Sequence, residues 1–213
     1  MADAAQGMFI TFEGSEGTGK TTQIQRLTSK LEELGWNVTV SREPGGTALG
    51  EEIRHLLKHA ASGKNMVPRT ELLLFAASRA QHVDELIQPN LQLGNIVICD
   101  RFHDSTTVYQ GIARAIDGAI VESINQIAIA STLPDITILI DLDPEEGFRR
   151  IESRNTEPPD RMEQEHMDFY KAVRQGYLHL AKNNSDRFLV IDGHQTIEAV
   201  EQAIWDGIKN RIK

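Results

Sequence analysis

Apolar residues recur along the chain in two alternating patterns, one typical of strands and one typical of helices. Five short runs rich in apolar residues predict strands at residues 8–13, 37–41, 95–99, 136–142 and 187–191. The run at 136–142 is almost continuously apolar, as in a strand that is buried on both faces. Each of these runs is followed by a segment with helical spacing or by a turn-rich loop.

The helical segments begin with Ile24 to Leu34, where apolar residues recur every three or four positions until Gly35. Further helices are predicted at residues 49–60, 69–88, 105–131 and 164–182, after Pro144, and from about residue 197. We expect Pro89 to end or kink the third helix, and an interruption near residues 117–118. Strands that alternate with helices predict an α/β fold, with a five-stranded parallel sheet covered by helices on both faces. In such sheets, ligands bind beyond the carboxyl ends of the strands.

Composition narrows the class of protein. The 213 residues fit one large domain spanning 1–213, or one domain with a mobile insertion, and 40% hydrophobic content is that of a globular protein. The formal charge of −9 argues against sequence-independent binding to nucleic acid, which needs a basic surface. Cys99 lies within an apolar run, so we expect it to pack in the core. The sequence has no basic, apolar leader and no long apolar segment, which predicts a cytoplasmic protein with no membrane partner.

Residues 14–21 read Gly-Ser-Glu-Gly-Thr-Gly-Lys-Thr and match the P-loop pattern G-x-x-x-x-G-K-[ST]. They follow a predicted strand and open a predicted helix, which is the context that this motif requires. The backbone N–H groups and the helix N-terminus would hold phosphates, with Lys20 reaching the β- and γ-phosphates and the Thr21 hydroxyl holding Mg²⁺. An ordinary Gly-rich turn is the alternative to this triphosphate site. The residues expected to contact ATP here are Gly14, Ser15, Glu16, Gly17, Thr18, Gly19, Lys20, Thr21 and Thr22.

Polar residues after the second and third strands indicate a second anionic group at the same edge of the sheet. Arg42 and Arg101 both follow strands there, and arginine binds phosphate in a bidentate manner. Surface ion pairs are the alternative for both residues. Asp100 ends the third strand, where an acidic residue could hold Mg²⁺ through water.

Together with three further motifs, these residues resemble the thymidylate kinases of the bacterial type. The shared motifs lie at residues 13–22, 42–47, 74–79, 100–101 with 105–106 and 109–111, and 160–163, in the family's order. The resemblance implies the three-layer P-loop nucleoside monophosphate kinase fold, with a short lid at about residues 149–163. It also implies a Mg²⁺-dependent dTMP kinase, which transfers the ATP γ-phosphoryl group to dTMP to give dTDP and ADP in dTTP synthesis. The family further suggests a homodimer packed through helices.

The resemblance implies roles for the residues that would read the base. Phe75 resembles the ring that stacks on thymine, although a core aromatic is the alternative. Arg79 resembles the donor to the thymine O4 carbonyl, with an exposed helical charge as the alternative. Thr106 resembles the side chain that meets the N3 edge of the base, with Ser105 and Gln110 beside it.

The remaining dTMP contacts involve the sugar and the phosphate. Tyr109 resembles the residue that crowds the sugar 2′ position, and a packing tyrosine is the alternative. Glu16 resembles the acidic residue that binds the 3′-hydroxyl, and a solvated loop carboxylate is the alternative. Arg42 and Arg101 would then hold the acceptor phosphate, with Arg101 also serving catalysis.

Catalytic positive charge is expected from the lid, because residues 15–18 of the P-loop include no basic residue. In the family, some members carry this arginine in the P-loop and others in the lid. Arg154 is the first choice and Arg150 the second. Two i,i+4 pairs, of Glu145 with Arg149 and Glu146 with Arg150, are also predicted. Arg149 is therefore explained equally well by a helix-surface ion pair and by a contact with ATP.

Two other functions are weighed against the dTMP kinase. A kinase for another nucleotide is disfavoured by Phe75, Arg79 and Thr106. A nucleotide-dependent switch would have no use for a second phosphate site. A GTPase would also need a guanine-reading N-K-x-D motif, which residues 182–186 do not supply.

Overall fold

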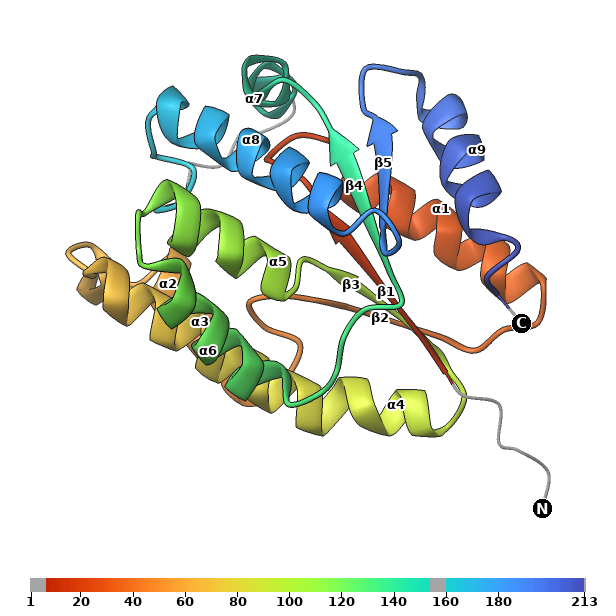
Figure 1. Cartoon of the computed structure of the whole chain (residues 1–213), viewed down its shortest axis with the longest axis horizontal. Helices are drawn as coiled ribbons and strands as arrows, with labels where there is room; N and C mark the ends of the chain where they lie inside the picture. The colour runs from red at the N-terminus through yellow and green to blue at the C-terminus, as the bar shows by residue number, and fades with distance from the viewer. Residues whose placement is uncertain (1–6, 154–159, 213) are drawn as a thin grey trace.

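The computed structural model describes residues 7–153 and 160–212, and its centre is a parallel β-sheet between two layers of helices (Figure 1). The strands in this part of the chain run in the order β2-β3-β1-β4-β5, and all neighbouring pairs are parallel. They are β1 (Met8–Glu13), β2 (Val38–Arg42), β3 (Ile96–Asp100), β4 (Ile136–Asp141) and β5 (Phe188–Asp192). All the predicted strands are confirmed to within one residue, and so are the α/β class and its three layers.

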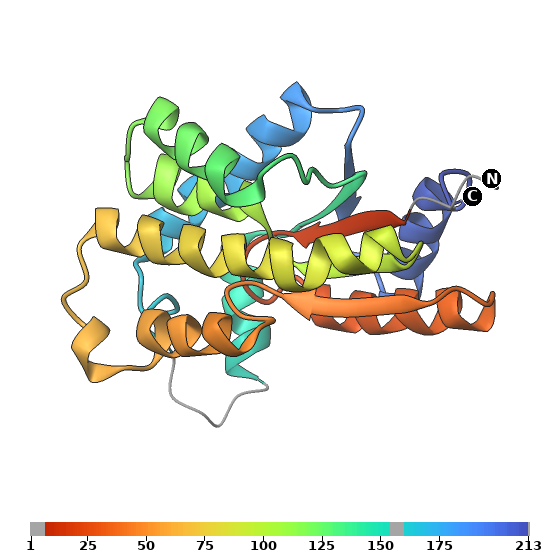
Figure 2. The same ribbon diagram turned by 90° about the horizontal axis from the view of Figure 1, so that it is seen from below.

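Helices cover both faces of the sheet (Figure 2). On one face, α1 (Lys20–Glu33) and α9 (Ile197–Ile208) pack against the alternate residues Ile10 and Phe12 of β1. On the opposite face, Val83 and Ile129 pack with Phe9 and Val97 of the sheet, and Val173 packs with Leu139. The helices not yet given are α2 (Ala48–Lys58), α3 (Pro68–His82), α4 (Gln88–Gln92), α5 (His103–Thr106), α6 (Gly118–Ile129), α7 (Pro144–Glu152) and α8 (Met167–Asn183). The short 3₁₀ helix η1 is Ala61–Gly63.

The predicted core position of Cys99 is confirmed. Its side chain is fully buried with Phe9 and Phe102, on the sheet face that the α6 layer covers. Burial raises the pKa of the thiol well above its ordinary value. The described helices include none that is long and apolar enough to span a bilayer.

Of the two outcomes predicted for Pro89, an end of the helix is wrong, because the helical stretch continues through it. After α3 the chain widens into the π-helical segment η2 (Val83–Ile87) and continues as α4. Pro89 lies in the first turn of α4, where its missing N–H does not interrupt a regular α-helical hydrogen bond. The interruption predicted near residues 117–118 is confirmed, since the π-helical segment η3 (Thr107–Ala113) ends before α6 begins.

Each strand ends on a polar residue at the same edge of the sheet. These last residues are Glu13, Arg42, Asp100, Asp141 and Asp192. Because all the strands are parallel, their carboxyl ends meet there, at the edge where α/β sheets bind ligands. The P-loop leaves β1 at this edge and leads into α1.

Candidate active site

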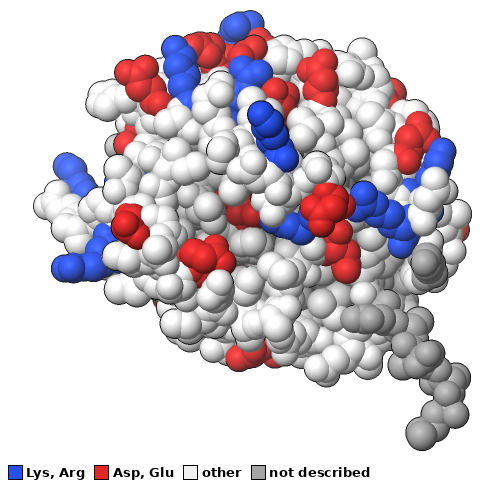
Figure 3. Space-filling view, in the orientation of Figure 1, with Lys and Arg blue, Asp and Glu red and all other residues white. Residues whose placement is uncertain are grey.

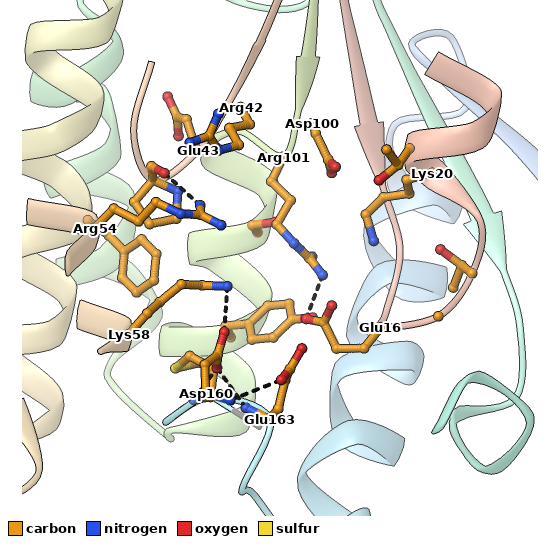
Figure 4. A pocket seen from close by; sticks show the side chains of 18 of the residues that line it. Glu16, Lys20, Arg42, Glu43, Arg54, Lys58, Asp100, Arg101, Asp160 and Glu163 are labelled. Carbon is orange, nitrogen blue, oxygen red and sulfur yellow. Dashed lines mark hydrogen bonds and ion pairs between the residues drawn. The ribbon is translucent and has the colours of Figure 1, made fainter. Parts of the chain in front are cut away.

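A cavity of about 290 Å³ lies at the carboxyl edge of the sheet (Figure 4). Its lining comes from residues 16–22 of the P-loop, residues 42–44 after β2, and side chains of α2, α3, α5 and η3. Asp160, Met162 and Glu163 line it from the segment before α8. The predicted triphosphate loop and the predicted acceptor site therefore share one cavity.

The P-loop backbone is in direct contact with helix α7. Gly17 has a φ of 71°, and a Cβ on it would overlap the carbonyl oxygen of Gly147. In the same way, a Cβ on Gly147 would overlap the carbonyl oxygen of Glu16. The two glycines let α7 rest on the loop, so the helix that carries Arg149 and Arg150 begins beside the triphosphate site.

Lys20 is folded back onto the loop that it follows. Its Nζ donates to the carbonyl oxygens of Gly14 at 3.1 Å and Ser15 at 2.8 Å. Burial and the nearby charge of Arg101 lower the pKa of the ammonium group. Lys20 lines the cavity with the rest of residues 16–22, whereas Gly14 and Ser15 are outside the lining.

Two oxygen-bearing side chains at the cavity fit a hard divalent cation. Asp100 Oδ1 is buried and makes no hydrogen bond with any described residue. Thr21 lines the same cavity from the start of α1. Mg²⁺ usually keeps several waters and phosphate oxygens as ligands, so one carboxylate and one hydroxyl suffice. No group of three or more His, Cys, Asp or Glu residues suited to a metal ion occurs among residues 7–153 and 160–212.

Arg101 is held in one place by its backbone and by its partners. Its φ is 70°, in the left-handed region, and its N–H donates to the Phe12 carbonyl at 2.9 Å. The guanidinium binds Glu16 at 2.8 Å (Figure 4). It also donates to the Tyr177 hydroxyl at 3.2 Å. Its side chain is 16% exposed, so the alternative of a surface ion pair is wrong for Arg101.

Glu16 lies between the cationic groups of the cavity. Burial raises the pKa of this carboxyl, but the charges of Arg101 and Lys20 outweigh burial and lower it to about 2. Tyr109 also donates to Glu16 Oε1, at 3.4 Å. The alternative of a solvated loop carboxylate is therefore wrong.

Glu13, which is not among the predicted site residues, binds the two hydroxyls to which Arg101 donates, those of Ser105 and Tyr177. Its carboxylate accepts from the Phe102 N–H at 2.8 Å, the Ser105 hydroxyl at 2.7 Å and the Tyr177 hydroxyl at 2.7 Å. Burial, with the neighbouring Asp104 charge, raises the pKa of Glu13 to about 7. The signal in the sequence was a carboxylate at the end of an otherwise apolar strand.

The predicted arginines Arg42 and Arg101 both line the cavity, and two further cations lie there with them. Arg42 lines the cavity, but its side chain is 52% exposed and pairs with Glu51 at 2.9 Å. Arg54 and Lys58 of α2 line the cavity as well, although sequence reasoning missed them. Arg54 donates to the Pro44 carbonyl at 2.8 Å, and burial lowers its pKa. The i,i+4 spacing of Arg54 and Lys58, which puts both on one face of α2, could have indicated them.

The residues expected around the base line one end of the cavity. Phe75 of α3 is half-buried there, with Ser105, Thr106 and Gln110. Thr106 Oγ1 is buried and has no hydrogen-bond partner among the described residues. The structure brings these four side chains together as predicted, and their contacts with a base remain predictions.

Tyr109 both packs and lines the cavity. Its ring meets Phe169 and Tyr177 edge-on, with centroids 5.9 and 6.3 Å apart. The same side chain belongs to the cavity lining. The two roles weighed for Tyr109 are therefore compatible.

Arg79 is outside the cavity lining and is 1% exposed. It forms an ion pair with Glu43 at 2.8 Å, and donates to Asn125 at 3.1 Å and to the Phe102 carbonyl at 3.2 Å. The alternative of an exposed helical charge is wrong, because residues from three other segments surround the guanidinium. Its contact with a base stays a prediction.

The two lid arginines that lie in α7, Arg149 and Arg150, bind local partners. Arg150 donates to Glu146 at 3.0 Å, as predicted, and to the Gly193 carbonyl at 3.1 Å. Arg149 is 71% exposed and pairs with Glu146. The predicted pair of Arg149 with Glu145 is wrong, because Lys171 of α8 binds Glu145 at 2.9 Å. Neither arginine lines the cavity, and Arg154 lies outside the described residues.

The site agrees with what comparison with known proteins shows. Residues 12–204 match the family model described as thymidylate kinase. The chain is 48% identical to the thymidylate kinase of Geobacter sulfurreducens, over 97% of this chain and 98% of that protein. It is 44% identical to the thymidylate kinase of Caldanaerobacter subterraneus subsp. tengcongensis, over 98% of each chain. The crystal structure of thymidylate kinase from Ehrlichia chaffeensis is similar with a TM-score of 0.77 and 37% identity, covering 95% of this chain and 98% of that one.

Proposed function

Because the chain belongs to the thymidylate kinase family, which phosphorylates dTMP with ATP, we propose that the cavity holds both nucleotides with their phosphates facing each other. The observation that supports this arrangement is the distribution of cations around one cavity. Lys20 lies on the P-loop side, Arg54 on the α2 side, and Arg101 between them (Figure 4). Phosphoryl transfer depends mainly on positioning and on positive charge around the moving group, and this cavity supplies both.

On the donor side, the P-loop residues from Gly14 to Thr22 bind the triphosphate of ATP. Lys20 exchanges its bonds to the loop carbonyls for the β- and γ-phosphate oxygens. That exchange is favourable because an ammonium binds an anionic oxygen more strongly than a neutral carbonyl. Contact of Arg149 with ATP would require the side chain to leave Glu146.

Thr21 and Asp100 are the residues that would hold the divalent cation, which we propose to be Mg²⁺. The buried, unpartnered Oδ1 of Asp100 supports this assignment. When bound, Mg²⁺ neutralises charge that develops on the transferring phosphate.

On the acceptor side, Arg101, Arg54 and Arg42 bind the dTMP phosphate. Arg101 is already oriented by Glu13, through the hydroxyls of Ser105 and Tyr177. Glu16 accepts from the sugar 3′-hydroxyl, and its low pKa keeps it an acceptor at neutral pH.

The base lies beside the ring of Phe75, with Thr106 and Gln110 at its edge. Tyr109 fills the space beside the sugar 2′ position. To donate to O4 of thymine, Arg79 would have to release one of its present partners. Alternatively, it could use a guanidinium N–H that none of these partners accepts.

The acceptor is a phosphate oxygen that is already anionic, so the reaction needs no general base. The chain's task is to bring two anions together and to neutralise the charge on the moving group. We assign the remaining positive charge to Arg154, with Arg150 as the second choice. Arg150 would have to break its hydrogen bonds to Glu146 and Gly193 before it could contact the moving phosphate.

A coupled assay with ATP and dTMP, run on Arg154→Ala and Arg150→Ala, tests this assignment. One variant should lose about 10³-fold or more in kcat, since arginines that reach the moving phosphate have effects of that size. The KM for dTMP should change little. Lys171→Ala is the matched control, because Lys171 is an exposed cation that pairs with Glu145 of α7 and lies outside the cavity lining. Equal activity of the Arg154 and Arg150 variants would contradict the assignment, and nucleotide hydrolysis without consumption of dTMP would contradict the proposed arrangement.

We also propose that the protein is a homodimer, packed through α6. Ile120 and Ile127 lie seven residues apart on one face of α6 and are 54% and 80% exposed. Charged side chains of both signs crowd the upper part of the face in Figure 3, and few lie over the lower part, where Figure 1 places α6. Ile127→Asp should shift sedimentation from dimer to monomer, while Leu93→Asp, an equally exposed change at the end of α4, should not. A monomeric wild type would contradict the proposal.

A further inference from the structure

We propose that Glu71 is a positioning residue that sets the orientation of the Gln110 amide and so selects an acceptor base with a hydrogen on N3. The inference rests on the proposed place of the base beside Phe75 and Thr106. Glu71 lies in the first turn of α3, and Gln110 lies in η3. Both side chains are 1% exposed, and Gln110 lines the cavity while Glu71 lies behind it.

Glu71 is bound by three side chains from other segments. Its Oε1 accepts from Gln110 Nε2 at 2.9 Å and from Arg114 Nε at 3.2 Å. Its Oε2 pairs with Arg161 at 2.6 Å. Burial raises the pKa of this carboxyl, but the hydrogen bond from Gln110 and the charges of both arginines lower it below its ordinary value. The carboxylate is therefore ionised at neutral pH.

An ionised carboxylate can only accept hydrogen bonds, whereas a glutamine amide has one end that donates and one end that accepts. Only the Nε2 end of Gln110 can therefore face Glu71. The opposite orientation would place two acceptor oxygens against each other in a buried site, which leaves both without a hydrogen bond. Glu71 thus turns the Oε1 end of Gln110 away from itself and toward the cavity that Gln110 lines.

An acceptor in that position distinguishes pyrimidine bases by the state of N3. Thymine and uracil carry a hydrogen on N3 and can donate it to Gln110 Oε1. Cytosine has a bare N3 acceptor, which would face a second acceptor and leave both desolvated and unpaired. With Glu71 in place, the amide cannot turn to accommodate cytosine. Glu71 therefore acts on base selection without touching the base.

The carboxylate of Glu71 also connects Gln110 to the segment before α8, through Arg161 and Arg114. Arg161 also donates to the Leu57 carbonyl at 2.7 Å, and its N–H donates to the Lys58 carbonyl at 3.2 Å. Arg114 bridges Glu71 to Glu165 at 2.6 Å. The orientation of Gln110 is thus supported by residues on both sides of the cavity.

Glu71→Gln tests the inference, because a glutamine at position 71 can donate or accept and so frees the amide of Gln110 to turn. The purified variant is assayed with ATP and dTMP, and dCMP is measured as a competitive inhibitor so that no turnover of dCMP is needed. We expect the ratio of the dCMP inhibition constant to the dTMP KM to fall about 10-fold or more, the effect of one buried hydrogen-bond mismatch. Glu165→Gln, which removes the other partner of Arg114 but does not touch Gln110, should leave this ratio unchanged.

A purely structural role for Glu71 would weaken dTMP and dCMP equally, and an unchanged ratio in Glu71→Gln would overturn the inference. If that variant does not fold, Gln110→Met removes the amide while keeping all three charged groups. The same fall in the ratio is expected there, and an unchanged ratio overturns the inference again. Phe75→Ala tests the underlying site separately, because an unchanged dTMP KM in that variant would mean that the base does not lie here.

Discussion

The acceptor side of the cavity and helix α7 hold their arginines in opposite ways. Arg101 is 16% exposed, has a left-handed backbone and binds Glu16, Tyr177 and Ser105. Arg149 is 71% exposed and shares Glu146 with Arg150 on the surface of α7. Arg101 is thus held by side chains from several elements, whereas Arg149 and Arg150 would have to leave Glu146 to make the phosphate contacts that we propose.

The difference follows from where each group lies in the fold. Arg101 directly follows a central strand, so residues from several elements surround it. The conformational entropy of its side chain is therefore lost when the protein folds. Arg149 and Arg150 lie in the last turn of a surface helix with an acidic partner one turn earlier. Exposed pairs of that kind contribute little stability and exchange partners readily. Under the proposed function, the acceptor phosphate would therefore bind an arginine that is already held in place, and positive charge from α7 would require Arg149 or Arg150 to move.

The largest effect is expected from Lys20, the cation of the P-loop, which lies apart from both groups of arginines. Lys20→Met should lower kcat by about 10²–10³-fold, the usual loss when one preorganised donor to developing charge is removed. Steady-state assays with saturating ATP and dTMP measure it. Lys30→Met is the matched control in the same helix, since Lys30 lies over the Trp205 ring and outside the cavity. Similar kcat values for the two variants would show that the P-loop lysine has no special role.

The second largest effect is expected from a change at the contact of α7 with the P-loop. In Gly147→Ala, the added Cβ would overlap the backbone oxygen of Glu16, so either the loop or the helix must shift. A displacement of about 1 Å near the reacting groups can cost about 10²-fold in rate, and we expect kcat to fall by up to that factor. In Gly118→Ala, a Cβ would meet nothing within 4 Å, so activity should persist. Full activity of the Gly147 variant would mean that the α7 contact does not position the loop.

A smaller effect is expected from Arg54 and Arg42, the two other arginines at the acceptor end of the cavity. Arg54→Ala should raise the KM for dTMP by about 10–100-fold, because a charge-assisted hydrogen bond to phosphate is lost from a partly buried site. Arg42→Ala should raise it less, since Arg42 is half-exposed and already paired with Glu51. Initial rates at varied dTMP and fixed ATP measure both. The reverse order would place the phosphate nearer the β2 loop than α2.

The smallest effects concern pH, where two neighbouring carboxyls respond in opposite directions. Glu16 has a folded pKa of about 2, below its ordinary value of 4.5, so its contribution to stability is present above pH 4.5 and lost as pH falls toward 2. Glu13 has a folded pKa of about 7, above 4.5, so the folded state binds a proton that the unfolded state has lost between these values. Stability due to Glu13 is therefore highest below pH 4.5 and falls as pH rises to about 7.

Urea unfolding of the wild type and Glu13→Gln between pH 4.5 and 7 measures the Glu13 contribution. The wild type should lose free energy of unfolding with rising pH relative to the variant, by at most about 1.4 kcal/mol per pH unit. Glu122→Gln, a change on the exposed face of α6, should follow the wild type. Parallel curves for the wild type and Glu13→Gln would show that Glu13 does not bind a proton in this range.

Features of the fold that depend on residues adjacent in the sequence could be predicted. The strand ends at Glu13, Asp100 and Asp141 follow from apolar runs that stop at a charged residue. The course of the chain at Pro89 could not, because packing in the α3 layer decides whether a helix continues through a π-helical turn.

Parts of the site were less predictable than the fold. The P-loop is contiguous, so its pattern identifies both its structure and its ligand. The i,i+4 spacing of Arg54 and Lys58 places both on one face of α2, but only the packing of α2 shows that this face lines the cavity. The partners of Arg79 could not be predicted either, because Glu43 and Asn125 are distant from it in sequence.

The sequence by itself determined the parallel sheet, the triphosphate loop and the family, because each rests on short-range patterns and on motifs in a set order. Only the tertiary structure decided which charges meet. In the structure, Arg101 pairs with Glu16, and Glu145 pairs with Lys171 instead of Arg149. Glu71 binds three side chains, those of Gln110, Arg114 and Arg161. The physical reason is that ion pairs and buried hydrogen bonds depend on distances of a few ångströms between elements. Those distances are set by how the helices pack on the sheet.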